Sequence, residues 1–128
     1  MNLLLDTQIF LWLEGDPARL SPAARNACTE VNHVLWLSVA SVWEMQIKIS
    51  LGKLRLGRPL AETVAGQQAA NGLRLLPVQL EHALAVGNLP AHHKDPFDRL
   101  LIAQARHENW EVVSADAEFR AYPVRVIW

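Results

Sequence analysis

The chain has one cysteine, no long apolar run and almost no net charge, and each absence excludes a class of protein. The single Cys28 cannot form an internal disulfide, and no Cys or His lies near it at metal-ligand spacing, so we expect it to be a small semi-buried apolar residue. The apolar N-terminal run ends at Asp6, which makes it too short for a signal peptide or a membrane span. We therefore expect a cytoplasmic protein with no membrane partner.

The charge balance is nearly even, with 12 basic and 13 acidic residues and a formal net charge of −1. An overall positive field, typical of nucleic-acid-binding proteins, is therefore missing. The distribution is less even, because residues 45–61 contain Lys48, Lys53, Arg55 and Arg58 and no acid. This basic segment is either a solvated helix end and loop or a surface that contacts phosphate groups.

Several catalytic signatures are also missing. The sequence has no Gly-x-Gly-x-x-Gly, no P-loop and no nucleophile elbow. This removes the main support for dinucleotide binding, nucleoside triphosphate binding and serine hydrolase activity. His92 and His93 are adjacent in a loop and would point apart, so we do not expect them to bind a metal. His33, His82 and His107 are scattered, and we expect them at the surface. The five tryptophans lie in apolar settings typical of a core or an interface.

Short apolar runs alternate with helical patterns along the chain. Strands are predicted at residues 3–5, 34–37, 73–77, 111–114 and 124–128. Helices are predicted at residues 9–13, from Pro22, from a capping box at 41–44 to about 51, and at 59–71, 81–86 and 95–107. This alternation predicts α/β architecture with a parallel sheet that is covered on both faces. The length of 128 residues, without repeats or linkers, predicts a single domain over residues 1–128.

Four acidic residues stand at the starts of predicted helices, and each has a structural explanation. Asp6 could cap the first helix, and Glu44 could close a capping box with Ser41. Asp98 lies in a first helical turn, where the helix dipole favours a carboxylate, and Asp116 could cap the short helix after the fourth strand. A binding module that keeps these acids only as helix caps is therefore one open alternative.

Taken together, the same four acids predict a site. Asp6 and Asp116 directly follow apolar strands, and ligands of open parallel sheets bind outside the carboxyl ends of the strands. Glu44 and Asp98 are expected in helical first turns that begin near the same edge. Asp98 also shares a helix face with apolar residues, and a carboxylate near apolar packing needs a compensating partner.

Four carboxylates in one cleft would repel each other unless a cation lay between them. Oxygen ligands without cysteine suit Mg²⁺ or Mn²⁺ and not Zn²⁺. One or two such cations can activate a water molecule for phosphodiester hydrolysis. A second alternative is a receiver-like domain whose acidic pocket accepts a phosphoryl group. Such a domain needs a lysine at the end of a late strand, and the chain has no lysine after Lys94.

The segments that carry these acids resemble a known family in order and spacing. They are Leu4-Leu5-Asp6-Thr7, residues 38–44 (SVASVWE), residues 95–105 (DPFDRLLIAQA), Ser114-Ala115-Asp116 and Val126-Ile127-Trp128. They resemble the PIN-domain family and, within it, the VapC-type toxins of bacterial toxin–antitoxin pairs. The resemblance covers nearly the whole chain, and the Asp-Pro-Phe-Asp-Arg segment is its most specific part.

The resemblance implies a three-layer α/β/α PIN fold with a central parallel sheet of about five strands. It implies a toxic endoribonuclease that depends on Mg²⁺, or on Mn²⁺, and cleaves RNA. Asp6 and Asp98 would be the principal metal ligands, Glu44 the third acid and Asp116 the fourth. Asp95 is a further acid of the same motif, for which we favour a helix-capping role. The resemblance also implies a homodimer and inhibition by a cognate antitoxin that lies across the active-site groove.

The resemblance extends to residues around the acids. Thr7 and Ser114 would donate hydrogen bonds that orient the carboxylates. Many relatives carry His where this chain has Gln8, a difference that concerns substrate contact only. If the substrate is RNA, we expect substitutions of Lys48 and Lys53 to weaken RNA binding without altering metal affinity.

Overall fold

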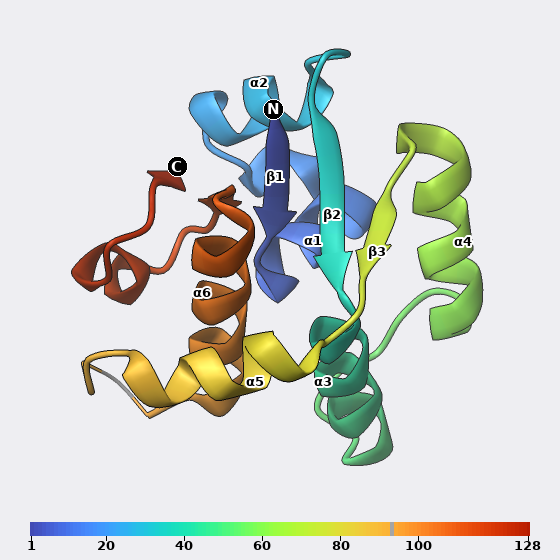
Figure 1. Ribbon diagram of the computed structural model, residues 1–128. Helices are drawn as coiled ribbons and strands as arrows, with labels where there is room; N and C mark the ends of the chain where they lie inside the picture. The colour runs from blue at the N-terminus through green and yellow to red at the C-terminus, as the bar shows by residue number, and fades with distance from the viewer. Residues whose placement is uncertain (93) are drawn as a thin grey trace.

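The computed structural model describes residues 1–92 and 94–128, so the prediction for His93 lies outside the described residues (Figure 1). Within this part of the chain, the strands are β1 (Asn2–Leu5), β2 (Val34–Ser38), β3 (Arg74–Leu76), β4 (Glu111–Val113) and β5 (Val126–Ile127). The α-helices are α1 (Thr7–Gly15), α2 (Pro22–Thr29), α3 (Val39–Ser50), α4 (Leu60–Asn71), α5 (Leu80–Ala85) and α6 (Pro96–Glu108). Short 3-10 helices are η1 (Pro17–Arg19), η2 (Val86–Asn88) and η3 (Ala117–Ala121). None of the described helices is long and apolar enough to cross a bilayer.

The described strands form one parallel sheet in the order β3-β2-β1-β4-β5, with helices on both faces (Figure 1). Leu3 and Leu5 of β1 belong to one core with residues of α1, α2 and α4, and Leu4 belongs to a second core with residues of α6. All three leucines are fully buried. Because side chains alternate between the faces of a strand, a continuous apolar run supplies both cores. The predicted three-layer α/β/α architecture is confirmed.

The position of β1 determines where a ligand can bind. The chain adds β2 and β3 on one side of β1 and then returns to add β4 and β5 on the other side. Leu5 is paired with Leu37 of β2 and with Val113 of β4, so the residues that follow these three strands lie at one level. Ligands of open α/β sheets bind at such a reversal, outside the carboxyl ends of the strands. The carboxyl edge between β1 and β4 is therefore the expected place for a site.

The start of α3 differs from the prediction. The helix is capped by Ser38, whose Oγ accepts a hydrogen bond from the Ala40 backbone N–H at 3.1 Å. Ser41 is buried in the first turn and Glu44 lies in the second, so the predicted capping box at residues 41–44 is wrong. The physical reason is that β2 runs directly into α3 without a loop. The predicted end is confirmed, because Gly52 follows α3 with a φ of +72°, a left-handed conformation that glycine adopts readily.

The burial of two side chains, Cys28 and His82, can be compared with the prediction. Cys28 is buried in the core that α1 and α2 share with the sheet, as expected. His82 was expected at the surface but is fully buried between α5 and α6. Its burial depends on a partner far along the chain, Glu108, whose Oε1 lies 3.0 Å from His82 Nε2.

Candidate active site

A pocket of about 350 Å³ opens at the carboxyl edge of the sheet. It is lined by Asp6, Thr7, Gln8, Leu11, Glu44, Lys48, Asp95, Asp98, Ala115 and Asp116. All four acids predicted from the sequence are brought together here, and Asp95 joins them. We call this cavity the acid pocket.

Asp6 follows β1 directly and is 8% exposed. Its backbone N–H donates to the Val113 carbonyl at 3.0 Å, which continues the pairing of β1 with β4. Although Asp6 occupies the N-cap position of α1, its side chain makes no capping hydrogen bond. The carboxylate instead accepts a hydrogen bond from Ser114 Oγ, at 2.8 Å from Oδ2. The interpretation of Asp6 as a helix-capping side chain is therefore wrong.

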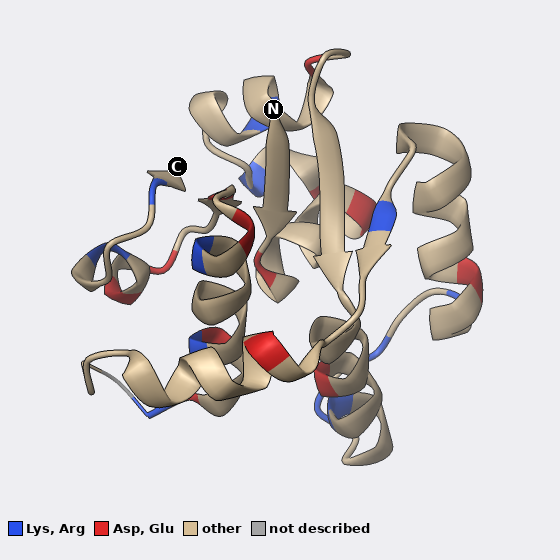
Figure 2. Cartoon of the chain, viewed as in Figure 1, with Lys and Arg blue, Asp and Glu red and all other residues tan. Residues whose placement is uncertain are grey.

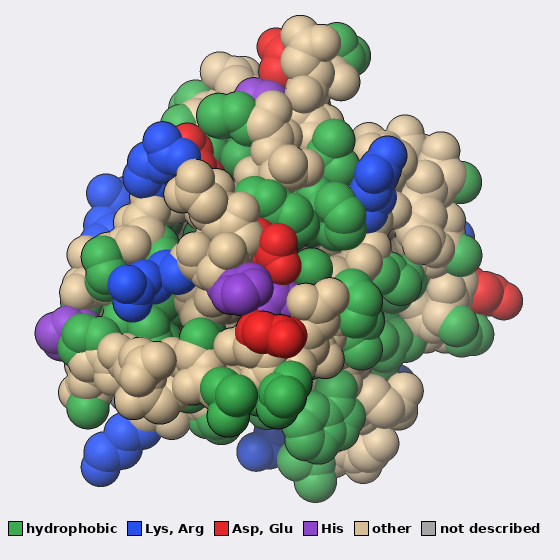
Figure 3. Space-filling model, viewed as in Figure 1, with side chains coloured by type: hydrophobic (Ala, Val, Ile, Leu, Met, Phe, Trp, Pro, Cys, Tyr) green, Lys and Arg blue, Asp and Glu red, His purple; other side chains and the backbone are tan. Residues whose placement is uncertain are grey.

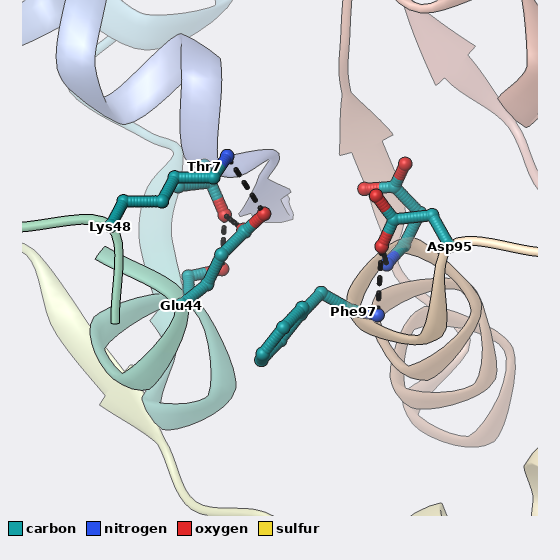
Figure 4. Close-up of polar contacts among 7 residues, drawn as sticks. Thr7, Glu44, Lys48, Asp95 and Phe97 are labelled. Carbon is teal, nitrogen blue, oxygen red and sulfur yellow. Dashed lines mark hydrogen bonds and ion pairs between the residues drawn. The ribbon is translucent and has the colours of Figure 1, made fainter. Parts of the chain in front are cut away.

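Glu44 reaches the acid pocket from α3, and its carboxylate is held at both oxygens (Figure 4). Thr7 Oγ1 donates to Glu44 Oε1 at 2.7 Å, and the Thr7 and Ser41 hydroxyl oxygens lie 2.9 Å apart. Lys48 Nζ lies 3.2 Å from Glu44 Oε2. The place of Lys48 in this pocket was not predicted from the sequence. Its position four residues after Glu44, where helical side chains are neighbours, was the signal that could have found it.

Asp98 and Asp95 stand at the start of α6 and have different roles. Asp95 Oδ1 caps the helix by accepting hydrogen bonds from the Phe97 and Asp98 backbone N–H groups, at 2.9 and 3.1 Å (Figure 4). This is the capping role that the sequence favoured. Asp98 lies in the first turn and lines the acid pocket.

Ser114 joins Asp6 to Asp116. Its hydroxyl donates to Asp6 and accepts from the Asp116 backbone N–H at 3.0 Å. Asp116 Oδ1 in turn caps η3 by accepting from the Glu118 backbone N–H at 2.9 Å. The predicted contacts of Thr7 and Ser114 with the acids are thus present.

Burial and mutual repulsion raise the pKa of two of these acids. Burial, together with the charges of Glu44 and Asp116, raises the pKa of Asp6 to about 6, although the hydrogen bond from Ser114 acts in the opposite direction. The pKa of Asp98 is raised to about 8, first by burial and then by neighbouring charges. Those charges are on Asp6, Asp95, Glu44 and Asp116. The dipole of α6 stabilises a carboxylate by only about 0.3–1 kcal/mol, less than one pKa unit, so it is outweighed.

Similarity to known proteins decides the family, because the PIN domain pattern matches residues 3–124. The chain belongs to the PIN-domain family. This PIN domain is 29% identical over 124 residues to Ribonuclease VapC22 of Mycobacterium tuberculosis (strain ATCC 25618 / H37Rv), covering 94% of this chain and 92% of that protein. The resemblance to VapC-type proteins predicted from the sequence is confirmed.

Solved structures show the same fold. VapBC2 from Rickettsia felis, bound to a DNA fragment from its promoter, has a TM-score of 0.74 at 17% identity, over 98% of this PIN domain and 97% of that chain. DNA-bound VapBC from Salmonella typhimurium has a TM-score of 0.66 at 17% identity, over 98% and 96% of the two chains. VapBC-5 from Mycobacterium tuberculosis has a TM-score of 0.62 at 17% identity, over 98% and 97%.

The chemistry of the acid pocket of this PIN domain fits a hard divalent cation. Its charged donors are carboxylates, and the hydroxyls of Thr7 and Ser114 orient them from behind. Oxygen ligands of this kind suit Mg²⁺ and Mn²⁺. Burial and then the neighbouring negative charges raise the pKa values of Asp6 and Asp98, and a bound cation would stabilise the charged carboxylates.

A second cluster of metal-ligand types lies at the other end of α6. Ligand atoms of His82, His107 and Glu108 lie within 4.8 Å of one another. Glu108 follows Asp98 by ten positions, which is a rise of about 15 Å along the helix axis. His82 Nδ1 accepts a hydrogen bond from the Gln79 backbone N–H at 3.1 Å, so its proton is on Nε2, which donates to Glu108.

This arrangement of His82 favours a structural role. A neutral histidine that binds a metal through Nε2 must carry its proton on Nδ1. Here that proton would face the N–H of Gln79, and the cap at the start of α5 would be lost. We therefore interpret the cluster as a hydrogen-bonded connection between α5 and α6.

The raised pKa values predict a pH dependence of stability. An acid whose pKa is higher in the folded chain than its ordinary value near 4 stabilises the fold at low pH, because the folded chain holds a proton that the unfolded chain releases. This stabilisation is lost as the pH rises from about 4 to about 6 for Asp6 and to about 8 for Asp98. In EDTA, we expect Asp98→Asn to raise the unfolding temperature at pH 8 by at least about 4 °C, which is roughly 1 kcal/mol in a domain of this size.

The difference between Asp98→Asn and the unmodified chain should disappear toward pH 4, and thermal unfolding at both pH values measures it. Glu62→Gln, an exposed acid in the first turn of α4, is the control; it removes a favourable helix-dipole interaction and should not raise the unfolding temperature at pH 8. An Asp98→Asn variant that unfolds with the unmodified chain at pH 8 would contradict the raised pKa.

Proposed function

We propose that this chain is a toxic endoribonuclease of a toxin–antitoxin pair, which hydrolyses RNA phosphodiester bonds with Mg²⁺ bound in the acid pocket. The observation that carries the proposal is the gathering of five carboxyl groups around one cavity at the reversal point of the sheet. The relative with 29% identity is named a ribonuclease, which supports RNA as the substrate.

Four acids of the pocket have a proposed role at the metal. Asp6 and Asp98 are the principal metal ligands, Glu44 is the third acid and Asp116 the fourth. When bound, Mg²⁺ supplies a Lewis acid that polarises the phosphate and lowers the pKa of a coordinated water. The chain itself fixes the carboxylates in place, through Ser114 on Asp6 and Thr7 on Glu44. Mn²⁺ fits the same ligands.

Two observations weigh against the alternatives left open by the sequence. A module that keeps the acids only as helix caps would use each carboxylate on a helix end, but the Asp6 side chain makes no such hydrogen bond. A receiver domain places its lysine at the end of a late strand, whereas Lys48 reaches the pocket from α3. The geometry of the pocket therefore favours metal-assisted hydrolysis.

Cleavage assays test the function directly. We expect RNA cleavage by the purified chain in Mg²⁺ to stop with EDTA and to fall at least about a hundredfold in Asp6→Ala and Asp98→Asn, because each removes a principal ligand. Glu62→Gln removes an acid outside the pocket and should cleave at the normal rate. Cleavage that survives both pocket substitutions would exclude this function. Labelling of the chain by a small phosphodonor would support the receiver alternative.

A groove beside the acid pocket supports an antitoxin partner. It has a volume of about 600 Å³, and Leu11, Trp12, Leu54 and Leu56 supply its apolar lining. Gln8 and Leu11 line both the groove and the acid pocket, so the two cavities adjoin. A bound segment with apolar side chains for the groove and a cationic side chain for the acids would complement both. We assign this groove to the cognate antitoxin.

The groove is tested with the cognate antitoxin of this chain. Leu56→Asp places a charge in the apolar groove and should weaken antitoxin binding at least about tenfold, as measured by calorimetry. Leu51→Asp is the matched control, because Leu51 lies in the same linker but is 63% exposed and lines neither the groove nor the acid pocket. Equal affinities for the Leu56→Asp and Leu51→Asp variants would argue against this groove as the binding site.

An exposed apolar patch supports a homodimer. It spans α3, α5 and the segment before α5, and Figure 3 shows apolar side chains gathered over these elements. Its members are Val39, Trp43, Val78, Leu80 and Leu84, which are 40–69% exposed. Monomers rarely expose contiguous apolar patches of this kind, and a two-fold axis lets one patch cover its own copy.

The oligomeric state is tested by sedimentation or light scattering. We expect the unmodified chain to be a dimer and Leu84→Glu to be a monomer, because a buried unpaired carboxylate would oppose association. Val31→Glu is the matched control, since Val31 is 91% exposed in the turn between α2 and β2. A Leu84→Glu variant that remains dimeric would place the interface elsewhere.

A further inference from the structure

Lys48 is the one basic side chain among the described residues that line the acid pocket. Its ammonium lies 3.2 Å from Glu44 Oε2, and Figure 4 shows the two side chains reaching toward each other beside Thr7. Figure 2 shows basic residues, and no acid, along the linker between α3 and α4. The contact with Glu44 brings one positive charge of the basic segment into the pocket.

The two partners of this ion pair differ in mobility. The Glu44 side chain is only 9% exposed, and Thr7 fixes its Oε1 at 2.7 Å. The Lys48 side chain is 48% exposed and flexible, so its ammonium can leave for water at little cost. Glu44 therefore stays in place whether or not Lys48 is bound to it.

We propose that the ammonium of Lys48 is a built-in counter-ion that competes with the divalent cation for Glu44 and so lowers the metal affinity of the pocket. The inference rests on the proposed function, because it requires the acid pocket to bind a metal. A positive charge near the cation repels it, and Lys48 must release Glu44 Oε2 before that oxygen can bind a metal. This replaces the expectation from the sequence that Lys48 leaves metal affinity unchanged.

The chain offers matched variants for the test. Lys48→Met removes the ammonium but keeps a long apolar stem, and Lys48→Arg keeps a positive charge at the same position. Lys53→Met removes one positive charge from the same basic segment, at a residue that does not line the acid pocket. Mn²⁺ binding to each full-length variant is measured by calorimetry at low salt, without RNA.

We expect Lys48→Met to bind Mn²⁺ about three- to fivefold more tightly than the unmodified chain, the range expected for a partly exposed ion pair. Lys48→Arg and Lys53→Met should stay within about twofold. Thermal unfolding gives a second readout. In EDTA, Lys48→Met should unfold at a lower temperature, because Glu44 loses its counter-ion, and Mg²⁺ should raise that temperature more than it does for the unmodified chain.

Each outcome separates this inference from the proposed function. Equal Mn²⁺ affinities for Lys48→Met and the unmodified chain would overturn the inference and leave the metal site standing. An equal gain in Lys53→Met would also overturn it, because the effect would then come from the general field of the basic segment. No Mn²⁺ binding by the unmodified chain would overturn the proposed function, and the inference with it.

Discussion

The burial of mutually repelling carboxylates at one edge of the sheet is the constraint on which the rest of the structure depends. The pKa values of about 6 for Asp6 and about 8 for Asp98 show that the fold holds these groups where charge is unfavourable. The fold can do so because their positions are fixed by other interactions. β1 is buried on both faces and paired with β2 and β4, so Asp6 cannot move away from the edge. The packing of the two cores stabilises the fold, and this stability offsets the unfavourable free energy of the buried acids in the pocket.

The architecture and the acids were predictable because both depend on local patterns. Apolar runs mark strands buried on both faces, and a parallel sheet brings the residues after those strands to one edge. The start of α3 was missed because Ser38 both ends β2 and caps the helix, so no turn residue marks the boundary. The burial of His82 was missed because it depends on Glu108, 26 residues away, and on the packing of α5 against α6. Contacts of this kind leave no local signal.

The roles of the acids could not be separated by sequence because caps and free carboxylates occupy the same positions. The structure divides them. Asp95 and Asp116 cap helices through their side chains, whereas Asp6 at its N-cap position does not. The difference lies in a residue beyond a neighbouring strand, since Ser114 after β4 donates a hydrogen bond to the Asp6 carboxylate. The position of an acid at a helix N-terminus therefore makes capping possible, and the hydrogen-bond partners of its carboxylate decide whether it caps the helix.

Helix α6 connects the two kinds of polar cluster in this molecule. Its N-terminal turn carries Asp98, whose pKa is strongly raised, and its C-terminal turn carries Glu108, which is bound to the buried His82. Between them the helix buries Leu101 and Ile102 against the sheet. Packing of these residues against the sheet holds the start of the helix in place and so offsets part of the electrostatic cost at its N-terminal turn. The fold can therefore keep five carboxyl groups around the acid pocket, and their oxygen atoms are the ligand type that a hard divalent cation prefers.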